Sequence, residues 1–296
     1  MSMTAANHSH VRRPSVKKVA RLTIRHVVLA ALAVFWLIPI VWLVLNAFSV
    51  DKGPNLSHFF PQALTLDHFK NILMPGTDSV NQFPRWFMNT FIVGCFTCVI
   101  STAFVLMVAY AMSCMRFPAR KPMMNVAIIL NLFPGFLSMI AVYFILKEFG
   151  LTNSLTGLVI VYSAGSGLGY LIAKGFFDTI SKSLREAAYI EGANEFVTFY
   201  KIIMPLAKPI IVYTVINSFL APWMDFVMAS LMLNSGISSG KTVALGLFAM
   251  VDKVNRNNYF GEFCAGGVIV SIPISVLFVI MQKFYVEGIT GGSVKG

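Results

Sequence analysis

Long apolar runs separated by short polar stretches make up most of the chain. A helix needs about 20 mainly apolar residues to cross a bilayer. Runs of that order cover residues 27–48, 87–112, 123–146, 155–173, 206–226 and 264–284. Pro39 is expected to bend the first of them. No run alternates apolar and polar residues as a membrane β-barrel strand does. The pattern therefore predicts an all-α polytopic membrane protein with six transmembrane helices.

Polar segments between these runs divide the chain. The expected divisions are a cytoplasmic N-terminal tail at 1–26, a first transmembrane helix at 27–48, an extracytoplasmic loop at 49–85, a membrane core at 86–287 and a cytoplasmic C-terminal tail at 288–296. Within the extracytoplasmic loop, residues 64–73 are predicted to form a short interfacial helix. A polar loop at 178–205 interrupts the core on the cytoplasmic side.

The polar loop at 178–205 has the pattern of two short helices joined at a glycine. Ser183 and Glu186 have the S-x-x-E spacing of a capping box, which predicts that a helix begins at Ser183. Gly192 is the predicted stop of that helix, and Asn194 is the predicted cap of the next. The second helix carries an apolar stripe at Phe196, Phe199, Tyr200 and Ile203. Pro205 interrupts it before the next apolar run. A soluble protein can bind such a pair of helices.

Two further features of the apolar runs leave alternatives open. Pro134 and Gly135 break the third run near its middle, which predicts either a simple packing kink or a segment that lines a cavity. Asp225 lies near the outer end of the fifth run. An acid at membrane depth indicates a functional site, whereas an acid at the interface indicates a helix cap.

Composition and charge narrow the class of protein. Hydrophobic residues make up 57% of the chain and the mean hydropathy is +0.74, which excludes an ordinary soluble domain. The net charge is +11, but its distribution follows the predicted topology. With both termini in the cytoplasm, the outer side carries only Lys52, Lys70, Arg85, Lys147, Lys241, Lys253 and Arg256. Most of the basic residues therefore lie on the predicted cytoplasmic side, as the positive-inside rule describes. This topology accounts for the positive net charge, so no nucleic-acid partner is expected.

The residue types that bind metals or catalyse reactions are poorly placed for either. Cys95 and Cys98 form a C-x-x-C motif, but inside a predicted span and without nearby histidines. Cysteine there is expected to fill space between helices rather than to bind zinc. The histidines all precede the second span, so they form no cluster with deep acids. We expect no catalytic residue and no metal site. The chain also lacks a Walker A motif, so it is not expected to hydrolyse ATP.

The polar loop resembles the EAA motif of permease subunits of bacterial ABC importers. The matching residues are Glu186, Ala187, Ala188, Gly192, Ile202, Pro205 and Leu206. Glu191 departs mildly, because many members carry aspartate there. The resemblance implies the type I importer permease fold, in which this loop is the coupling helix and docks on an ATPase subunit. The residues implied in that contact are Ser183, Glu186, Ala187, Ala188, Gly192 and Pro205. An amphipathic loop helix without a partner is the alternative.

From Phe87 to the end, the chain is similar to the carbohydrate-uptake branch of these permeases. Tyr110-Ala111 followed by Arg116-Phe117-Pro118 carries part of that resemblance. The ending, with Gly291, Gly292 and Lys295, is similar to that of maltose-importer permeases. In that family the tail reaches toward the ATPase dimer, so these three residues are implied in coupling. A solvated terminus is the alternative interpretation.

The resemblance implies a complete import system. The expected partners are a second permease subunit in a heterodimer, two ATPase subunits, an extracytoplasmic solute-binding protein and the lipid bilayer. The expected location is the bacterial cytoplasmic membrane. ATP and Mg²⁺ would bind the ATPase, with no cofactor on this chain. The expected substrate is maltose, maltodextrin or another oligosaccharide, or else a different small solute. A secondary transporter would need paired intramembrane charges or inverted repeats, and neither is evident.

Sugar sites are built from aromatic platforms and from amides that bind hydroxyls. Candidates for the substrate pathway are Asn131, Tyr143, Asn217 and Trp223. Membrane proteins also use such residues for packing and at the membrane interface, which is the alternative for each of them.

Overall fold

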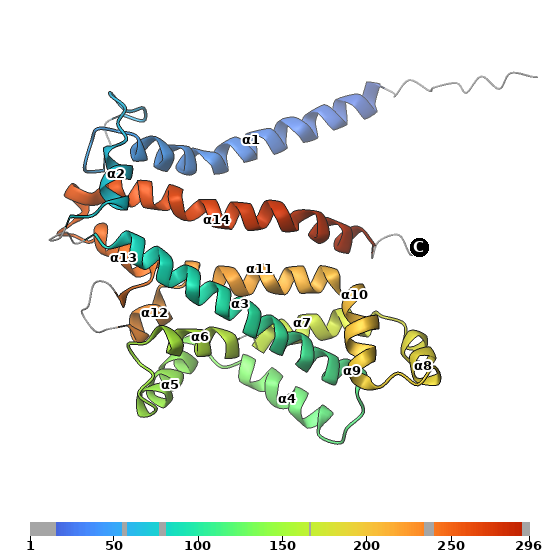
Figure 1. The fold of residues 1–296 in the computed structure, drawn as a ribbon. Coiled ribbons are helices and arrows are strands. Elements are labelled where there is room, and N and C mark those ends of the chain that lie inside the picture. Colours follow the sequence, from blue (N-terminus) through green and yellow to red (C-terminus); the bar gives the residue numbers. More distant parts are fainter. Residues whose placement is uncertain (1–15, 55–57, 77–80, 166, 234–239, 292–296) are drawn as a thin grey trace, which may run out of the picture.

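The computed structural model describes residues 16–54, 58–76, 81–165, 167–233 and 240–291 (Figure 1). Its helices are α1 (Val16–Ala47), α2 (Asp67–Leu73), α3 (Phe83–Cys114), α4 (Arg120–Asn131), α5 (Gly135–Glu148), α6 (Leu155–Ala164), α7 (Gly167–Asp178), α8 (Lys182–Ile190), α9 (Glu195–Val197), the π-helix η1 (Thr198–Ile203), α10 (Met204–Leu206), α11 (Lys208–Met224), α12 (Val227–Met232), α13 (Val243–Met250) and α14 (Arg256–Gly291). The all-α prediction is therefore confirmed.

The long helices run side by side, with α3 at the centre of the bundle. α3 packs against α6, α7 and α11, while α14 packs against α11 on one side and α1 on the other. The short helices gather at the two ends (Figure 1). One end holds α2, α12 and α13, and the other holds α8, α9 and α10. The first turns of α1 and the last turns of α14 lie toward the same end as α8.

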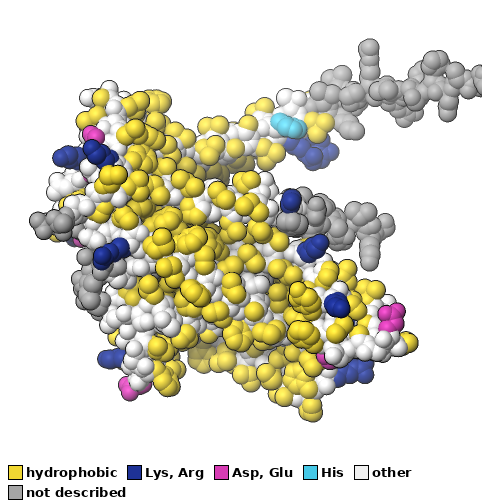
Figure 2. Space-filling model, in the orientation of Figure 1, with side chains coloured by type: hydrophobic (Ala, Val, Ile, Leu, Met, Phe, Trp, Pro, Cys, Tyr) yellow, Lys and Arg dark blue, Asp and Glu magenta, His cyan; other side chains and the backbone are white. Residues whose placement is uncertain are grey.

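Several helices are long and apolar enough to cross a membrane. Within the described residues, the single helices that qualify are Ala20–Ala47, Phe83–Cys114, Leu155–Asp178 and Arg256–Lys283. Two bent pairs also qualify: Arg120–Asn131 with Gly135–Glu148, at 105°, and Glu195–Leu206 with Lys208–Met224, at 84°. The count reaches the predicted six if each bent pair is one span. Figure 2 shows hydrophobic side chains over the middle of the molecule and charged side chains toward its ends.

Helix ends differ from the edges of the apolar runs. α1 begins at Val16, inside the segment predicted as an N-terminal tail, and α14 extends from Arg256 to Gly291, well beyond the predicted 264–284. Hydropathy locates the part of a helix that lipid covers, whereas backbone hydrogen bonding continues into polar residues beyond it. The short helix predicted at 64–73 is present as Asp67–Leu73.

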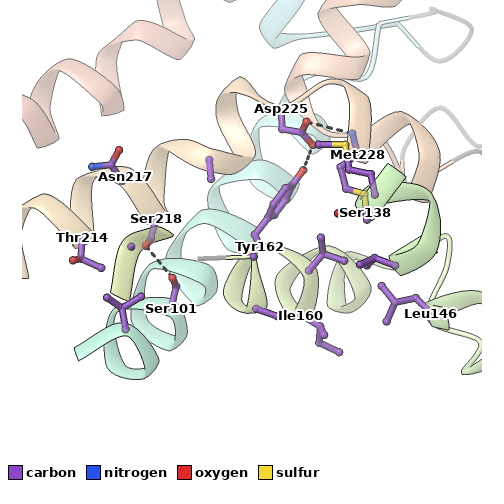
Figure 3. Close-up of a pocket in the computed structure, with 18 of the residues that line it drawn as sticks. Ser101, Ser138, Leu146, Ile160, Tyr162, Thr214, Asn217, Ser218, Asp225 and Met228 are labelled. Carbon is purple, nitrogen blue, oxygen red and sulfur yellow. Dashed lines mark hydrogen bonds between the residues drawn. The ribbon is translucent and has the colours of Figure 1, made fainter. Parts of the chain in front are cut away.

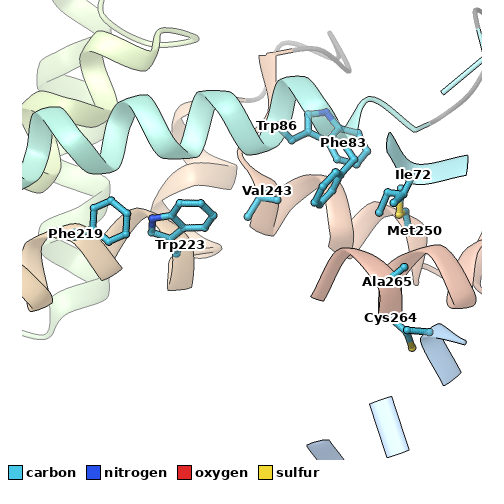
Figure 4. Packing of buried hydrophobic residues seen from close by; sticks show 10 residues of the cluster. Ile72, Phe83, Trp86, Phe219, Trp223, Val243, Met250, Cys264 and Ala265 are labelled. Atoms are coloured by element: carbon cyan, nitrogen blue, oxygen red, sulfur yellow. The ribbon is translucent and has the colours of Figure 1, made fainter. Parts of the chain in front are cut away.

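A hydrophobic cluster joins α3, α11, α13 and α14 near the end that carries α2 (Figure 4). Trp86 and Met250 are fully buried in it, and Phe83 is almost so. The backbone of Gly246 approaches the Trp86 ring so closely that a Cβ atom there would lie 2.0 Å from a ring carbon. Only glycine fits at this crossing, and it lets α13 close over the tryptophan.

α2 is held on α14 by a buried polar contact. His68 Nδ1 lies 3.4 Å from Glu262 Oε1, and both side chains are almost completely buried. On the other side of the ring, His68 Nε2 lies 3.2 Å from the Asp51 carbonyl oxygen. Asn71 donates a 3.3 Å hydrogen bond to the same glutamate oxygen. The imidazole therefore joins the segment around Asp51, α2 and α14.

We expect the docking of α2 to weaken as pH rises above 6.5. The hydrogen bond to Glu262 raises the pKa of His68 above its ordinary value of 6.5, although burial opposes that shift. A raised pKa in the folded state means that the stabilisation is complete below pH 6.5 and is lost as pH rises through the higher value. Amide exchange of residues 67–73, corrected for intrinsic rates, should therefore accelerate as pH rises. His68→Gln should remove this pH dependence and His26→Gln should not. An unchanged profile in His68→Gln would show that another group is responsible.

Candidate functional site

The polar loop of the sequence forms one continuous element at the end of the bundle. We call residues 181–207, from Ser181 through α8, α9, η1 and α10 to Ala207, the hinge segment. α8 begins at Lys182, with Ser181 in the N-cap position. The predicted capping box is therefore wrong, because a capping serine must lie just outside the first turn and Ser183 lies inside it. The Ser183 hydroxyl is instead 2.6 Å from that of Ser181.

The end of α8 is set by Gly192, as the sequence predicts. Its φ angle is +83°, which side chains with a Cβ adopt only with strain. The Ala193 N–H donates to the Ala188 carbonyl at 2.9 Å, and the Gly192 N–H donates to that of Tyr189 at 3.0 Å. These two bonds form a Schellman motif, which fixes the direction in which the chain leaves the helix.

The second half of the hinge segment begins as predicted but does not continue as a regular α-helix. Asn194 Oδ1 accepts a 2.9 Å hydrogen bond from the Val197 N–H, so Asn194 is the N-cap. The six residues Thr198–Ile203 then form a π-helix before α10. Pro205 lies in α10 and has no N–H to offer the preceding turn, which fits a local departure from α-helical bonding. The chain bends by 84° where α11 begins.

The hinge segment exposes large apolar side chains beyond the end of the bundle. Ile190 is 87% exposed and Phe196 is 73% exposed. The Phe196 and Tyr200 rings stack with an interplanar angle of 6°. Glu186 is exposed on α8 as well, whereas Ala188 is buried against the body of the protein. This surface combines apolar area with a carboxylate, as a protein-binding surface does.

A cavity of about 790 Å³ lies farther along the bundle, between α3, α5, α6, α7 and α11 (Figure 3). Its walls are mainly aliphatic. Polar side chains among them are Ser101, Ser138, Tyr162, Tyr213, Thr214, Asn217, Ser218 and Asp225. The volume is within the range of about 300–1,000 Å³ that is typical of ligand pockets. α5, which follows the break at Pro134-Gly135, lines this cavity from Ser138 onward, whereas the two residues of the break itself are not among the lining residues.

Asp225 lies at one end of the cavity, where α11 ends and α12 begins. Its Oδ2 accepts a 2.6 Å hydrogen bond from the Tyr162 hydroxyl and a 3.0 Å bond from the Ala229 N–H. Its Oδ1 lies 3.3 Å from the Met228 nitrogen. The carboxylate therefore binds the first turn of α12 and also forms part of the cavity wall (Figure 3). The helix-cap alternative left open by the sequence is therefore confirmed, while a functional role for this acid stays a prediction.

The four residues proposed for the substrate pathway lie apart. Asn217 lines the cavity. Asn131 is exposed at the end of α4, and its amide donates to the Ala127 carbonyl. Tyr143 packs in an apolar cluster beside the Phe144 ring. Trp223 is only 5% exposed and packs in the hydrophobic cluster of Figure 4. The structure thus places one of the four on the cavity.

Sequence reasoning missed most of the polar lining, although α11 contains a signal for it. Its cavity-lining residues, together with its C-cap Asp225, are Tyr213, Thr214, Asn217, Ser218 and Ala221. They recur at the spacing of one helical face, so a small and polar stripe runs along an otherwise apolar helix.

Of the residues proposed in the C-terminal tail, Gly291 is the last residue of α14. Gly292 and Lys295 lie outside the described residues.

The chain is similar to known proteins over nearly its whole length. It is 33% identical to the galactooligosaccharides transport system permease protein GanQ of Bacillus subtilis (strain 168), over 95% of this chain and 98% of that protein. It is 31% identical to the maltose/maltodextrin transport system permease protein MalG of Escherichia coli (strain K12), over 94% and 97% of the two chains.

The fold has a solved counterpart. A bacterial ABC transporter involved in the import of the acidic polysaccharide alginate contains a chain that superposes with a TM-score of 0.76, at 22% identity, over 93% of this chain and 100% of that one. Residues 106–291 match the family model for the inner membrane component of binding-protein-dependent transport systems. The resemblance inferred from the EAA residues is confirmed. The chain belongs to the family of binding-protein-dependent transport system inner membrane components.

Proposed function

We propose that this chain is the permease subunit of an ATP-driven importer that takes up sugars, with maltodextrins and other oligosaccharides as the substrate class. The hinge segment is the observation that supports the proposal most directly. It is an exposed pair of helices whose relative direction is fixed by a glycine turn, and such an element is suited to dock on a soluble ATPase and to move with it. The relatives named for galactooligosaccharide and maltodextrin transport support the choice of sugar. The chain itself performs no chemistry in this proposal.

The hinge segment docks on an ATPase subunit. Ile190 and Phe196 supply apolar area for a groove on that subunit, and Glu186 is available to a basic side chain there. The same surface also offers the exposed residues Ser183, Ala187, Gly192 and Pro205. ATP and Mg²⁺ bind the ATPase dimer, and its closure favours one of the two orientations of the permease pair. Gly291, Gly292 and Lys295 extend the contact from the C-terminal side.

The cavity forms part of the substrate pathway. Scattered hydroxyl and amide groups can exchange hydrogen bonds with sugar hydroxyls, while aliphatic walls between them keep each contact weak. A pathway requires such weak contacts, because a transported solute must leave as readily as it enters. A second permease subunit, paired as a heterodimer, completes the pathway. A solute-binding protein delivers sugar at the end of the bundle that carries α2, α12 and α13.

Reconstitution with an ATPase tests this function. The permease pair, the ATPase and the binding protein are placed in proteoliposomes, and uptake of a radiolabelled maltodextrin is measured with and without internal ATP. We expect uptake that requires ATP and that unlabelled oligosaccharides compete away. Uptake driven by an ion gradient without ATP would contradict the proposal and indicate a secondary transporter.

The proposed orientation places the hinge segment and both termini in the cytoplasm. The basic residues Arg120 and Lys182 should then face inward, while Lys70 and Lys253 should face outward. Each position is replaced singly by cysteine in a cysteine-free background and treated with an impermeant thiol reagent on intact cells. We expect labelling at 70 and 253, and labelling at 120 and 182 only after the membrane is opened. Reaction of position 182 in intact cells would reverse the orientation.

A further inference from the structure

The cytoplasmic-side end of α3 is held by a buried tyrosine. Tyr110, which is 5% exposed, lies one turn before the last residue of α3. Its hydroxyl donates a 2.6 Å hydrogen bond to Glu195 Oε2 at the start of α9. A bond to a carboxylate is stronger than one between neutral groups. The tyrosine ring also packs edge-on against Phe199, with centroids 5.0 Å apart.

A second contact reaches the same end of α3 from the other half of the hinge segment. Arg185 Nη1 on α8 donates a 2.6 Å hydrogen bond to the carbonyl oxygen of Cys114, the last residue of α3. A cation at this position also interacts favourably with the helix dipole. Arg185 precedes the Gly192 turn and Glu195 follows it. The end of α3 is therefore bonded on both sides of the turn.

α3 connects these contacts to the cavity. Ser101 and Val105, which precede Tyr110 on this helix, line its wall. The Ser101 hydroxyl accepts a 3.1 Å hydrogen bond from Ser218 on α11 (Figure 3). A displacement of the hinge segment that carries the end of α3 with it must therefore also move one wall of the cavity.

We propose that Glu195 and Arg185 are positioning residues that join the hinge segment to α3, so that movement of the segment reshapes the cavity. This inference rests on the proposed function. Apolar contacts alone would let the segment tilt against α3, because they are not directional. Two short bonds to one helix end, on opposite sides of the glycine turn, fix both the distance and the rotation of the segment.

The test measures sugar imported per ATP hydrolysed in proteoliposomes that contain the whole complex. Glu195→Ala and Tyr110→Phe should each lower this ratio at least about fivefold, in line with the loss of one hydrogen bond to a charged group. ATP hydrolysis and the yield of assembled complex should change little. Glu195→Gln, which retains an acceptor for the tyrosine hydroxyl, should keep most of the ratio. Arg185→Leu should lower the ratio independently.

The double variant Glu195→Ala/Tyr110→Phe distinguishes an effect of the Tyr110–Glu195 hydrogen bond from an effect of a direct contact between Glu195 and the ATPase. If Tyr110 acts through its bond to Glu195, the double variant is no worse than Glu195→Ala alone. Additive losses, or normal coupling in Tyr110→Phe, would overturn the inference. Tyr259→Phe, which removes a hydroxyl at the opposite end of the bundle, is the matched control. Failure of the proposed function is distinguishable, because it would leave the wild-type complex without ATP-dependent uptake.

Discussion

A complex that carries Gly192→Val is expected to hydrolyse ATP while importing at least about tenfold less sugar, a ratio that corresponds to about 1.4 kcal/mol. At φ +83° a residue with a Cβ atom is strained by about 1–2 kcal/mol, and a β-branched residue is worse. The strain is relieved if the turn opens and the two Schellman hydrogen bonds break. The second half of the hinge segment then leaves α8 in a different direction, so docking no longer aligns the two halves.

The surroundings of Gly192 make this a clean test. An added Cβ atom there meets nothing within 4 Å, so the backbone angle alone causes the effect. Gly192→Asn should retain much of the uptake, because asparagine tolerates the left-handed region. Gly175→Val makes the same change in α7, at a position with equally open space, and serves as the control. Sugar uptake and ATPase activity are measured together. Normal uptake by Gly192→Val at equal expression would remove the hinge segment from the mechanism.

Replacement of Asp225 by alanine is expected to have the second large effect, on both folding and transport. The change leaves the Tyr162 hydroxyl and the first backbone N–H groups of α12 without their acceptor. Each hydrogen bond to a charged group contributes about 1.5–3 kcal/mol. We therefore expect a clear drop in the thermal stability of the detergent-solubilised complex, together with a loss of uptake.

Comparison with two other variants separates the roles of Asp225. Asp225→Asn retains acceptor capacity and should be milder in both assays. Tyr162→Phe leaves the bonds to α12 in place, so its effect reports on the cavity wall. Asp252 is the matched control, since it accepts from the Asn255 N–H at 2.8 Å in a loop away from the cavity. Asp252→Ala should cost only about 0.5–2 kcal/mol, as an ordinary cap does. An equal effect of the two alanine substitutions would contradict a special role for Asp225.

The sequence predicted the features that depend on neighbouring residues. The apolar runs, the stop at Gly192 and the cap at Asn194 each follow from a short pattern, and the structure contains them. The start of α8 was misplaced because Ser181 and Ser183 carry the same side chain, so the capping pattern does not distinguish them. The structure has Ser181 in the N-cap position, although its side chain makes no capping hydrogen bond.

The features that the sequence did not predict depend on contacts between distant helices. Trp223 looks like a sugar platform in the sequence, yet it is buried against α3, where Phe87 packs on its ring. The cavity takes its lining from several helices, so no single run of the sequence reveals it. Only the stripe on α11 could have been recognised beforehand. The π-helix was also missed, because no single residue type specifies it.

The π-helix η1 has a consequence for the register of the hinge segment. Each of its hydrogen-bonded rings contains one residue more than that of an α-helix. If one residue between Thr198 and Ile203 were lost, regular α-helical bonding could resume, but the preceding part would rotate by about 100° about the helix axis. Phe196 would then leave the exposed face, and Glu195 would turn away from Tyr110. The π-helix thus sets the rotation of the residues before it about the helix axis. This rotation directs Phe196 to the exposed face and Glu195 to Tyr110 at the same time.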